Sequence, residues 1–265
     1  MHKNYYFIAG LPRSGSTLLS AILKQNPNFH ADIASALSPL CISAIDSIEV
    51  SDNKFNIGEE QRKNIILSIF EGYYKHVDKP IIFDSFRIWT KNTSLLKYLF
   101  PNTKILCPVR DIHEIIDSFE RIWSKNPLYN ADMVKITHNV YARAECLMER
   151  NSGIIARPLN LLKESHAAYP EMIYFIEYND LCKNPEKTIR GVYNFLEMPY
   201  YDHDYENVEY SNEKFDEKIN VKGMHTVRKK VEYVPKKLSI PKDLINLYKN
   251  LEFWRDEKKS MTTYN

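Results

Sequence analysis

Residues 5–17 read YYFIAGLPRSGST, and the expected fold follows from this stretch. Its first part, Tyr5–Ala9, is a short apolar run that ends at a glycine, which indicates a buried strand. Apolar residues between positions 18 and 23 then recur at helical spacing, so we expect a helix to begin near Ser16. A strand, a glycine-containing turn and a helix in direct succession form a setting in which the turn can surround an anion.

The turn itself, residues 10–17, nearly matches the phosphate-loop pattern GxxxxGK[ST], with serine in place of the lysine. Such a loop gathers backbone N–H groups around an anion, and the helix that follows adds the positive end of its dipole. We expect an arginine in the loop to supply the cation that the missing lysine would have given. The residues predicted to hold the anion are Arg13, Ser14, Gly15, Ser16 and Thr17. A tight turn without a ligand is the plainer alternative, but it does not require arginine and hydroxyl residues around a glycine.

Strands and helices alternate along the chain outward from this turn. The segments expected to be strands are Tyr5–Ala9, Pro80–Asp84, Lys104–Val109 and Glu171–Tyr178. Helical periodicity is found over Glu59–Tyr74, Thr93–Phe100, Asp111–Trp123, Met133–Arg150, Leu159–Ala168 and Asn184–Leu196. The alternation predicts an α/β fold in which a parallel sheet is flanked by helices.

Ligands of open parallel sheets bind at the carboxyl ends of the strands. In this chain those ends carry the loop of residues 10–17 and, on three further strands, Asp84, Arg110 and Tyr178. Because the carboxyl ends of parallel strands meet at one edge, we expect these four features to lie close together. The sequence thus predicts a site before any family is considered.

Length and composition limit the classes of protein to which this chain can belong. The 265 residues fit one domain over residues 1–265, with an irregular covering segment and a C-terminal helix near Lys242–Trp254 within about 200–265. A net charge of +2 and the lack of a basic–aromatic stripe disfavour nucleic acid as a partner. No run approaches the ~18 apolar residues of a membrane span. Four cysteines without a CxxC pair, and a start unlike a signal peptide, predict reduced thiols and a cytoplasmic location.

Two stretches of the sequence resemble the donor-binding motifs of sulfotransferases that use 3′-phosphoadenosine 5′-phosphosulfate (PAPS). PRSGST at Pro12–Thr17 resembles the family's 5′-phosphosulfate loop. PVRDIHEIIDSF at Pro108–Phe119 is similar to the motif that binds the 3′-phosphate, which has an arginine followed eight residues later by a serine. The resemblance therefore assigns the 3′-phosphate to Arg110 and Ser118, and the planar fork of an arginine suits bidentate contacts with phosphate. An ordinary salt-bridged helix start is the alternative for the arginine.

Two later stretches extend the resemblance to about residue 230. IEYNDL at Ile176–Leu181 is similar to a family stretch whose tyrosine contacts the nucleotide, which implies that role for Tyr178. GMHTVRKK at Gly223–Lys230 falls where the family places a basic loop that closes over the nucleotide, and this implies a donor contact for Arg228. A half-buried aromatic and a solvated charge run are the alternatives for these two residues.

The resemblance implies a P-loop-like nucleotide-binding fold. It also implies transfer of a sulfuryl group from PAPS to an acceptor hydroxyl, with 3′-phosphoadenosine 5′-phosphate (PAP) as product and no metal. A small molecule, a carbohydrate or a peptide would be the acceptor. A P-loop small-molecule kinase is one alternative, although such enzymes use the loop lysine and magnesium. A catalytically inactive protein that binds PAP or another nucleotide is the second alternative.

The catalytic base is harder to assign. Tyrosylprotein sulfotransferases carry a glutamate roughly twenty residues past the loop, and the comparable stretch here lacks it but contains His30 and Asp32. We expect Asp84 to be the base because it ends a strand at the ligand edge. Arg87 is expected to replace a lysine that supports the leaving group in some family members. The predicted catalytic residues are Arg13, Asp84 and Arg87; a cap, or an ion pair with Arg87, is the alternative role for Asp84.

Overall fold

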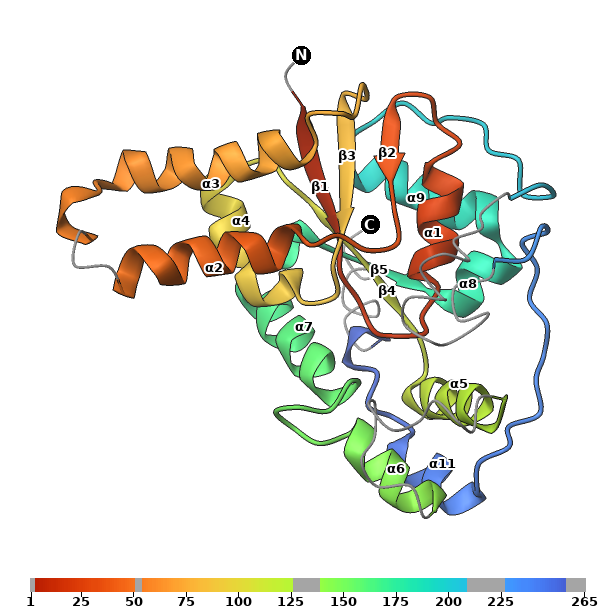
Figure 1. Cartoon of the computed structure of the whole chain (residues 1–265). Coiled ribbons are helices and arrows are strands. Elements are labelled where there is room, and N and C mark those ends of the chain that lie inside the picture. The colour runs from red at the N-terminus through yellow and green to blue at the C-terminus, as the bar shows by residue number, and fades with distance from the viewer. Residues whose placement is uncertain (1–2, 51–53, 126–138, 209–226, 256–265) are drawn as a thin grey trace.

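A five-stranded parallel sheet forms the centre of the protein, with strand order β2-β3-β1-β4-β5 (Figure 1). The computed structural model describes residues 3–50, 54–125, 139–208 and 227–255. The strands are β1 (Asn4–Ile8), β2 (Phe29–Ala31), β3 (Ile81–Ser85), β4 (Ile105–Val109) and β5 (Ile173–Glu177). Since all four strand pairings are parallel, every strand ends at the same edge of the sheet.

Helices cover both faces of this sheet. The helices are α1 (Ser16–Leu23), α2 (Leu37–Val50), α3 (Glu59–Tyr73), α4 (Thr93–Leu99), α5 (Ile112–Lys125), α6 (Val140–Leu147), α7 (Ala156–Ala168), α8 (Tyr178–Lys183), α9 (Pro185–Phe195) and α11 (Lys242–Tyr248). One apolar cluster lies between the sheet and residues of α2 to α7 and α11. The other lies between the opposite face and α1, α8 and α9.

Alternation along each strand decides which cluster a side chain joins. On β1, Phe7 packs in the first cluster and Ile8 in the second. On β3, Ile82 packs in the first cluster and Phe83 in the second. This two-residue period is the geometry of an extended chain, and it determines the face of the sheet to which each side chain within a strand points.

The structure confirms the expected α/β fold and the strand–turn–helix at the start of the chain. It adds β2, α2 and α8, which the sequence patterns did not indicate. The expected strand over 171–178 is shorter, because Pro170–Met172 forms a 3₁₀ turn and Tyr178 already begins α8. Residues 133–138 of one expected helix lie outside the described residues, and the described part, α6, ends at Leu147.

The C-terminal helix expected over 242–254 is also shorter, since α11 ends at Tyr248. Asn250 adopts a φ of 68°, a left-handed conformation that no α-helix can contain. The chain therefore turns, and residues 251–255 run back toward the sheet and bury Trp254 completely. In the expected irregular segment, the described residues 201–208 and 227–241 contain neither helix nor strand.

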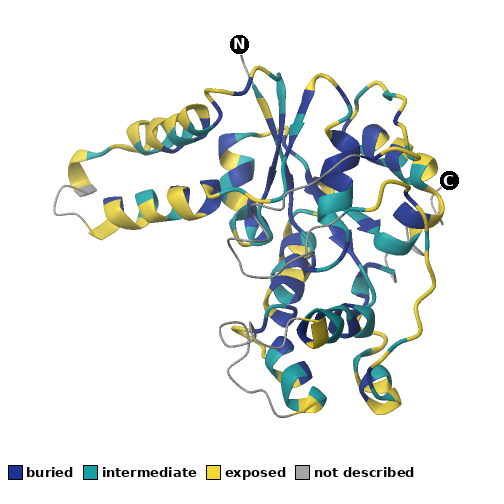
Figure 2. Cartoon of the chain, turned by 45° about the vertical axis from the view of Figure 1, so that its right-hand side comes forward, coloured by how far each residue is buried: buried dark blue, intermediate teal, exposed yellow. Residues whose placement is uncertain are grey.

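Helices α2 and α3 contact each other and extend away from the sheet as an arm (Figure 1). Much of its surface is exposed, including Phe55 at 88% in the connection between the helices (Figure 2). Among the described residues, no helix combines the length and the apolar character that a bilayer crossing requires.

Candidate functional site

A cavity of about 580 Å³ opens at the carboxyl edge of the sheet. Three parts of the chain form its wall: the loop between β1 and α1, residues 85–88 at the end of β3, and one side of α5. Tyr178 at the start of α8 and the irregular segment after residue 227 complete it. The expectation that the strand ends build one site is confirmed for the ends of β1, β4 and β5.

The loop after β1 has a backbone that depends on glycine. Gly15 has a φ of 87°, and a Cβ there would lie 2.7 Å from the Tyr178 ring, so a larger residue would require the ring to move. Arg13 also adopts a positive φ, of 57°, which is uncommon for a residue with a side chain. The arginine, Gly15, Ser16 and Thr17 line the cavity, and α1 begins directly behind them at Ser16.

The Ser14 hydroxyl does not take the place predicted for it. Ser14 is fully buried, its Oγ donates to the Pro12 carbonyl oxygen at 3.3 Å, and it is absent from the cavity wall. The hydroxyl thus stabilises the turn instead of facing an anion, because it reaches a carbonyl within the loop itself.

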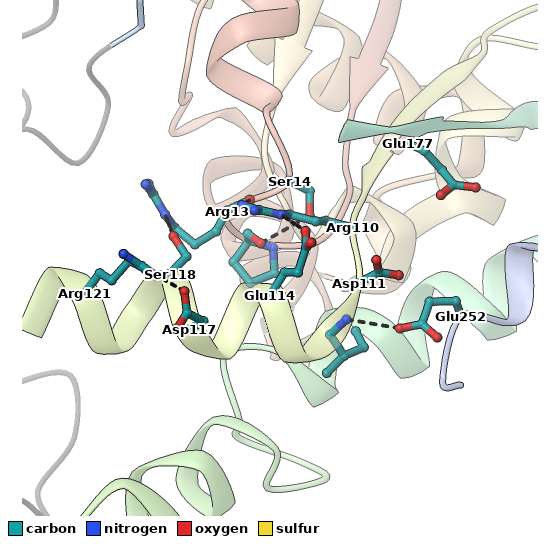
Figure 3. A network of polar contacts seen from close by, with 12 residues as sticks. Arg13, Ser14, Arg110, Asp111, Glu114, Asp117, Ser118, Arg121, Glu177 and Glu252 are labelled. Carbon is teal, nitrogen blue, oxygen red and sulfur yellow. Dashed lines mark hydrogen bonds and ion pairs between the residues drawn. The ribbon is translucent and has the colours of Figure 1, made fainter. Parts of the chain in front are cut away.

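The predicted 3′-phosphate residues lie opposite the loop, on and just before α5 (Figure 3). The Arg13 Nε donates to the Ser118 Oγ at 3.2 Å, so the two motifs are in direct contact. The Arg110 guanidinium lies over the Tyr178 ring, 4.5 Å from its centroid. Its Nε also donates to Glu114 Oε2 at 2.8 Å. The arginine that the sequence assigns to a phosphate is therefore already paired with a carboxylate.

Basic side chains outnumber carboxylates on the described cavity wall. They include Arg13, Arg87, Arg110, Arg121, Arg228 and Lys236. Carboxylates on the described wall are already paired with arginines: Glu114 with Arg110, Asp117 with Arg121, and Glu232 with Arg228 at 3.9 Å. The resulting positive field suits a ligand with more than one anionic group.

Lys236 is a wall residue that the sequence analysis missed. Burial lowers the pKa of its ammonium group, and the nearby Arg110, Arg228, Arg121 and Arg13 lower it further. A lysine that four arginines face has a strong electrostatic reason to bind an anion. Within an irregular segment no periodicity marks it, so only the surplus of basic residues after position 227 offered a signal.

Arg87 lines the cavity beside the loop, as predicted. Burial lowers the pKa of its guanidinium, and the positive charge of Arg13 lowers it further. In the part of the chain that the structure describes, no hydrogen bond or ion pair engages this guanidinium. The positive charges of Arg87 and Arg13 thus lie near each other at the cavity wall.

The structure opposes the prediction that Asp84 is the catalytic base. Asp84 is completely buried and does not line the cavity. Its Oδ2 accepts from the Tyr74 hydroxyl and its Oδ1 from the Trp89 Nε1, each at 2.5 Å. Burial raises the pKa of the carboxyl, although hydrogen bonds oppose that shift. It shares a strand face with Ile82, so it faces the first apolar cluster, while Ser85 faces the cavity.

The two other candidate bases do not line the cavity either. The His30 ring packs 5.4 Å from the Tyr74 ring, and Asp32 is half exposed with Lys24 at 4.0 Å. Ile33 and Ala34 are the residues of this stretch that line the cavity wall. Since neither side chain faces the loop arginine, the structure does not bring a predicted base into the site.

One group of side chains has the spacing of a metal site. Ligand atoms of Asp111, His113 and Glu114 lie within 4.8 Å of one another. Both carboxylates are engaged by arginines, however: Asp111 by Arg255 at 2.7 Å and Glu114 by Arg110. A metal ion would have to displace both cations, so the donor set does not fit one.

The family model described as the sulfotransferase family matches residues 6–202. The chain belongs to the sulfotransferase family. It is 24% identical over 206 residues to protein-tyrosine sulfotransferase A of Caenorhabditis elegans, covering 75% of this chain and 51% of the relative. It is 23% identical over 209 residues to protein-tyrosine sulfotransferase 1 of Danio rerio, covering 74% and 54%. The chain thus spans about half the length of these curated relatives.

Solved sulfotransferase structures share the fold. The sulfotransferase domain from the curacin biosynthetic pathway aligns with a TM-score of 0.54 at 17% identity, covering 100% of this chain and 99% of that one. A mouse sulfotransferase complexed with PAP aligns with a TM-score of 0.50 at 14% identity, covering 97% and 83%. At these identities the likeness concerns the fold, and the function of the cavity has to be argued from its own residues.

Proposed function

We propose that this sulfotransferase uses PAPS as donor and transfers its sulfuryl group to the hydroxyl of an acceptor, releasing PAP. The observation that carries the proposal is a pair of basic groups in one cavity. Arg13 belongs to the loop and Arg110 with Ser118 to the β4–α5 junction, and the two groups meet where Arg13 Nε donates to Ser118 Oγ. PAPS also has two anionic ends, a 5′-phosphosulfate and a 3′-phosphate, so its charges match this arrangement. The PAP bound to a family member of the same fold supports the same donor.

The loop end would hold the phosphosulfate. Backbone N–H groups of the loop and the first turn of α1 would face the 5′-phosphate, together with the hydroxyls of Ser16 and Thr17. In the reaction a bond forms between the acceptor oxygen and sulfur while the bond from sulfur to the bridging oxygen breaks, and the proton of the acceptor hydroxyl is released to solvent. Arg13 and Arg87 would stabilise the negative charge that develops on this oxygen.

The α5 end would hold the 3′-phosphate. Arg110 would exchange its ion pair with Glu114 for the phosphate, and Ser118 would donate its hydroxyl hydrogen. Tyr178 packs between Gly15 and Arg110, where its ring would contact the nucleotide. Arg228 and Lys236 would add charge from the irregular segment.

The acceptor that suits the cavity best carries a phenolic hydroxyl. Ile33, Phe86 and Ile88 line the wall near Arg87, and an aromatic ring fits such a surface better than a sugar. Phenols also ionise near pH 10, well below alcohols, and the two arginines favour the anion. The relatives named protein-tyrosine sulfotransferases support a phenol, either free or in a peptide.

Thermal denaturation with ligands tests the proposal. PAP in the presence of a chelator should raise the melting temperature more than ATP with magnesium does, because the loop lacks the lysine that a kinase uses. A larger rise with ATP and magnesium would favour the kinase alternative. Release of PAP from PAPS, increased by a simple phenol, separates an enzyme from an inactive nucleotide-binding protein. The single domain over residues 1–265 and the cytoplasmic location stay predictions.

A further inference from the structure

The C-terminal segment after α11 reaches the donor site without entering the cavity. Residues 251–255 pack across β5, where Trp254 is fully buried and Phe253 lies 5.6 Å from the Phe175 ring. Neither Glu252 nor Arg255 lines the cavity. The segment can therefore influence the site only through residues that lie between it and the cavity.

Arg255 bridges the ends of two strands. Its Nη1 lies 2.7 Å from Asp111 Oδ1, and its Nη2 lies 2.7 Å from Glu177 Oε2. The Nε donates to the same glutamate oxygen at 3.0 Å. These carboxylates are the direct neighbours of Arg110 and Tyr178, the pair that stacks at 4.5 Å in the donor site. One guanidinium therefore ties together the backbones that carry both donor residues.

Glu252 contacts the start of α5, the helix that follows Asp111 (Figure 3). Its Oε1 accepts from the backbone N–H of Ile112 at 3.2 Å, and the residue is 8% exposed. Ile112 is the first residue of α5, so this carboxylate satisfies one of the N–H groups that a helix start leaves without a partner. The negative charge of a carboxylate there also interacts favourably with the positive end of the helix dipole.

We propose that Arg255 is a positioning residue for the donor site, which holds Arg110 and Tyr178 in register for the 3′-phosphate through Asp111 and Glu177. The inference rests on the proposed binding of PAP. Arg255 also neutralises two carboxylates beside an anion site, where they would otherwise repel the donor. Burial opposes the charge of Arg255, but the hydrogen bonds that it donates to Glu177 and Asp111 raise the pKa of its guanidinium.

The test compares selectivity for the 3′-phosphate, measured as the ratio of the dissociation constants of adenosine 5′-monophosphate (AMP) and PAP. Arg255→Ala should lower this ratio by about tenfold, the smaller of the effects that losing outer contacts has at metal sites. AMP binding should stay within about twofold, the usual independence of separate sites. Trp254 keeps the segment docked, so a melting curve should show a folded protein. If Arg255→Ala does not fold, Arg255→Gln removes the bridge between both carboxylates and is measured instead.

Arg143→Ala is the matched control. Arg143 makes a two-bond pair with Glu120 that joins α6 to α5, at 2.8 and 2.6 Å, and neither residue lines the cavity. Its variant should loosen α5 and leave the selectivity ratio unchanged. An unchanged ratio in Arg255→Ala, or an equal fall in both variants, would overturn the inference. Failure of the wild-type protein to bind PAP would instead overturn the proposed function, and the inference with it.

Discussion

The ends of β3 and β4 lie at the same edge of one sheet, yet the charged residues there have different fates. Asp84 is the fourth residue of the five in β3 and is completely buried. Arg110 is the first residue beyond β4, and it reaches the cavity. The Asp84 side chain points into an apolar layer, whereas a side chain just past a strand can turn to the open edge.

This difference explains why the structure opposes the prediction that Asp84 is the catalytic base. Asp84 faces the layer of Tyr74 and Trp89, which satisfy its carboxylate oxygens in the core. One residue later, Ser85 lies on the cavity wall. A position at a strand end therefore predicts a functional residue only when the face of the sheet to which its side chain points is also known.

The largest expected effect comes from Arg13, at the junction of the loop and α5. Arg13→Ala should reduce the rate of sulfuryl transfer by about 10²–10³-fold, as for loss of a preorganised donor to developing charge. It should also weaken PAP binding, because it removes the contact with Ser118 and a charge at the 5′ end. Steady-state rates with PAPS and a phenol measure this. A loss below about tenfold would contradict the catalytic role.

Arg110→Ala tests the β4 end of the comparison. The variant should weaken PAP binding by about 1.5–3 kcal/mol, the range for a hydrogen bond to a charged group, and leave AMP binding nearly unchanged. Its melting temperature should stay near the wild-type value, since Glu114 is partly exposed and can be hydrated. Equal losses for both nucleotides in calorimetry would give Arg110 another role.

Asp84→Asn tests the β3 end and should have the opposite result. Loss of one acceptor in the core should lower the free energy of unfolding by about 1–3 kcal/mol, with PAP affinity unchanged in the folded protein. Asp32→Asn is the control, because Asp32 is half exposed and outside the cavity. Urea denaturation and calorimetry measure the two quantities. Full stability of Asp84→Asn together with a collapsed catalytic rate would restore the base assignment.

The raised pKa of Asp84 adds a pH dependence with a definite sign. The folded state binds the Asp84 proton more tightly than the unfolded state, so its contribution is fully present below the unfolded pKa. The contribution falls as the pH rises from that value through the raised folded pKa. The stability advantage of the wild type over Asp84→Asn should therefore be greater at about pH 4 than at about pH 7. An advantage that grows with pH would contradict this.

Lys236 gives the smallest expected effect. Lys236→Ala should weaken PAP binding by about 1 kcal/mol, whereas Lys229→Ala, an exposed residue outside the wall, should not. Because burial and four arginines lower the pKa of Lys236, wild-type affinity should fall as the pH rises through that pKa. Lys236→Arg should remove this fall, since arginine stays charged. Identical pH profiles would show that the lysine does not contact the anion.

Local motifs made the loop and the α5 side of the cavity predictable. The loop of residues 10–17 and the Arg110–Ser118 pair each lie within one strand–helix junction, so short sequence patterns describe them. The contacts that the sequence did not indicate join distant positions. Glu252 caps a helix 140 residues earlier, and Arg255 contacts a glutamate 78 residues earlier. Such contacts depend on the tertiary path of the chain, which periodicity does not report.

Calorimetric titration of the wild-type protein with PAP and with AMP, in the presence of a chelator, tests the central claim most directly. The two ligands differ only in the 3′-phosphate, which is the group assigned to Arg110 and Ser118. We predict that PAP binds at least about tenfold more tightly, the smallest difference expected from one charged hydrogen bond. Equal affinities, or tighter binding of ATP with magnesium, would contradict a cavity built for PAPS.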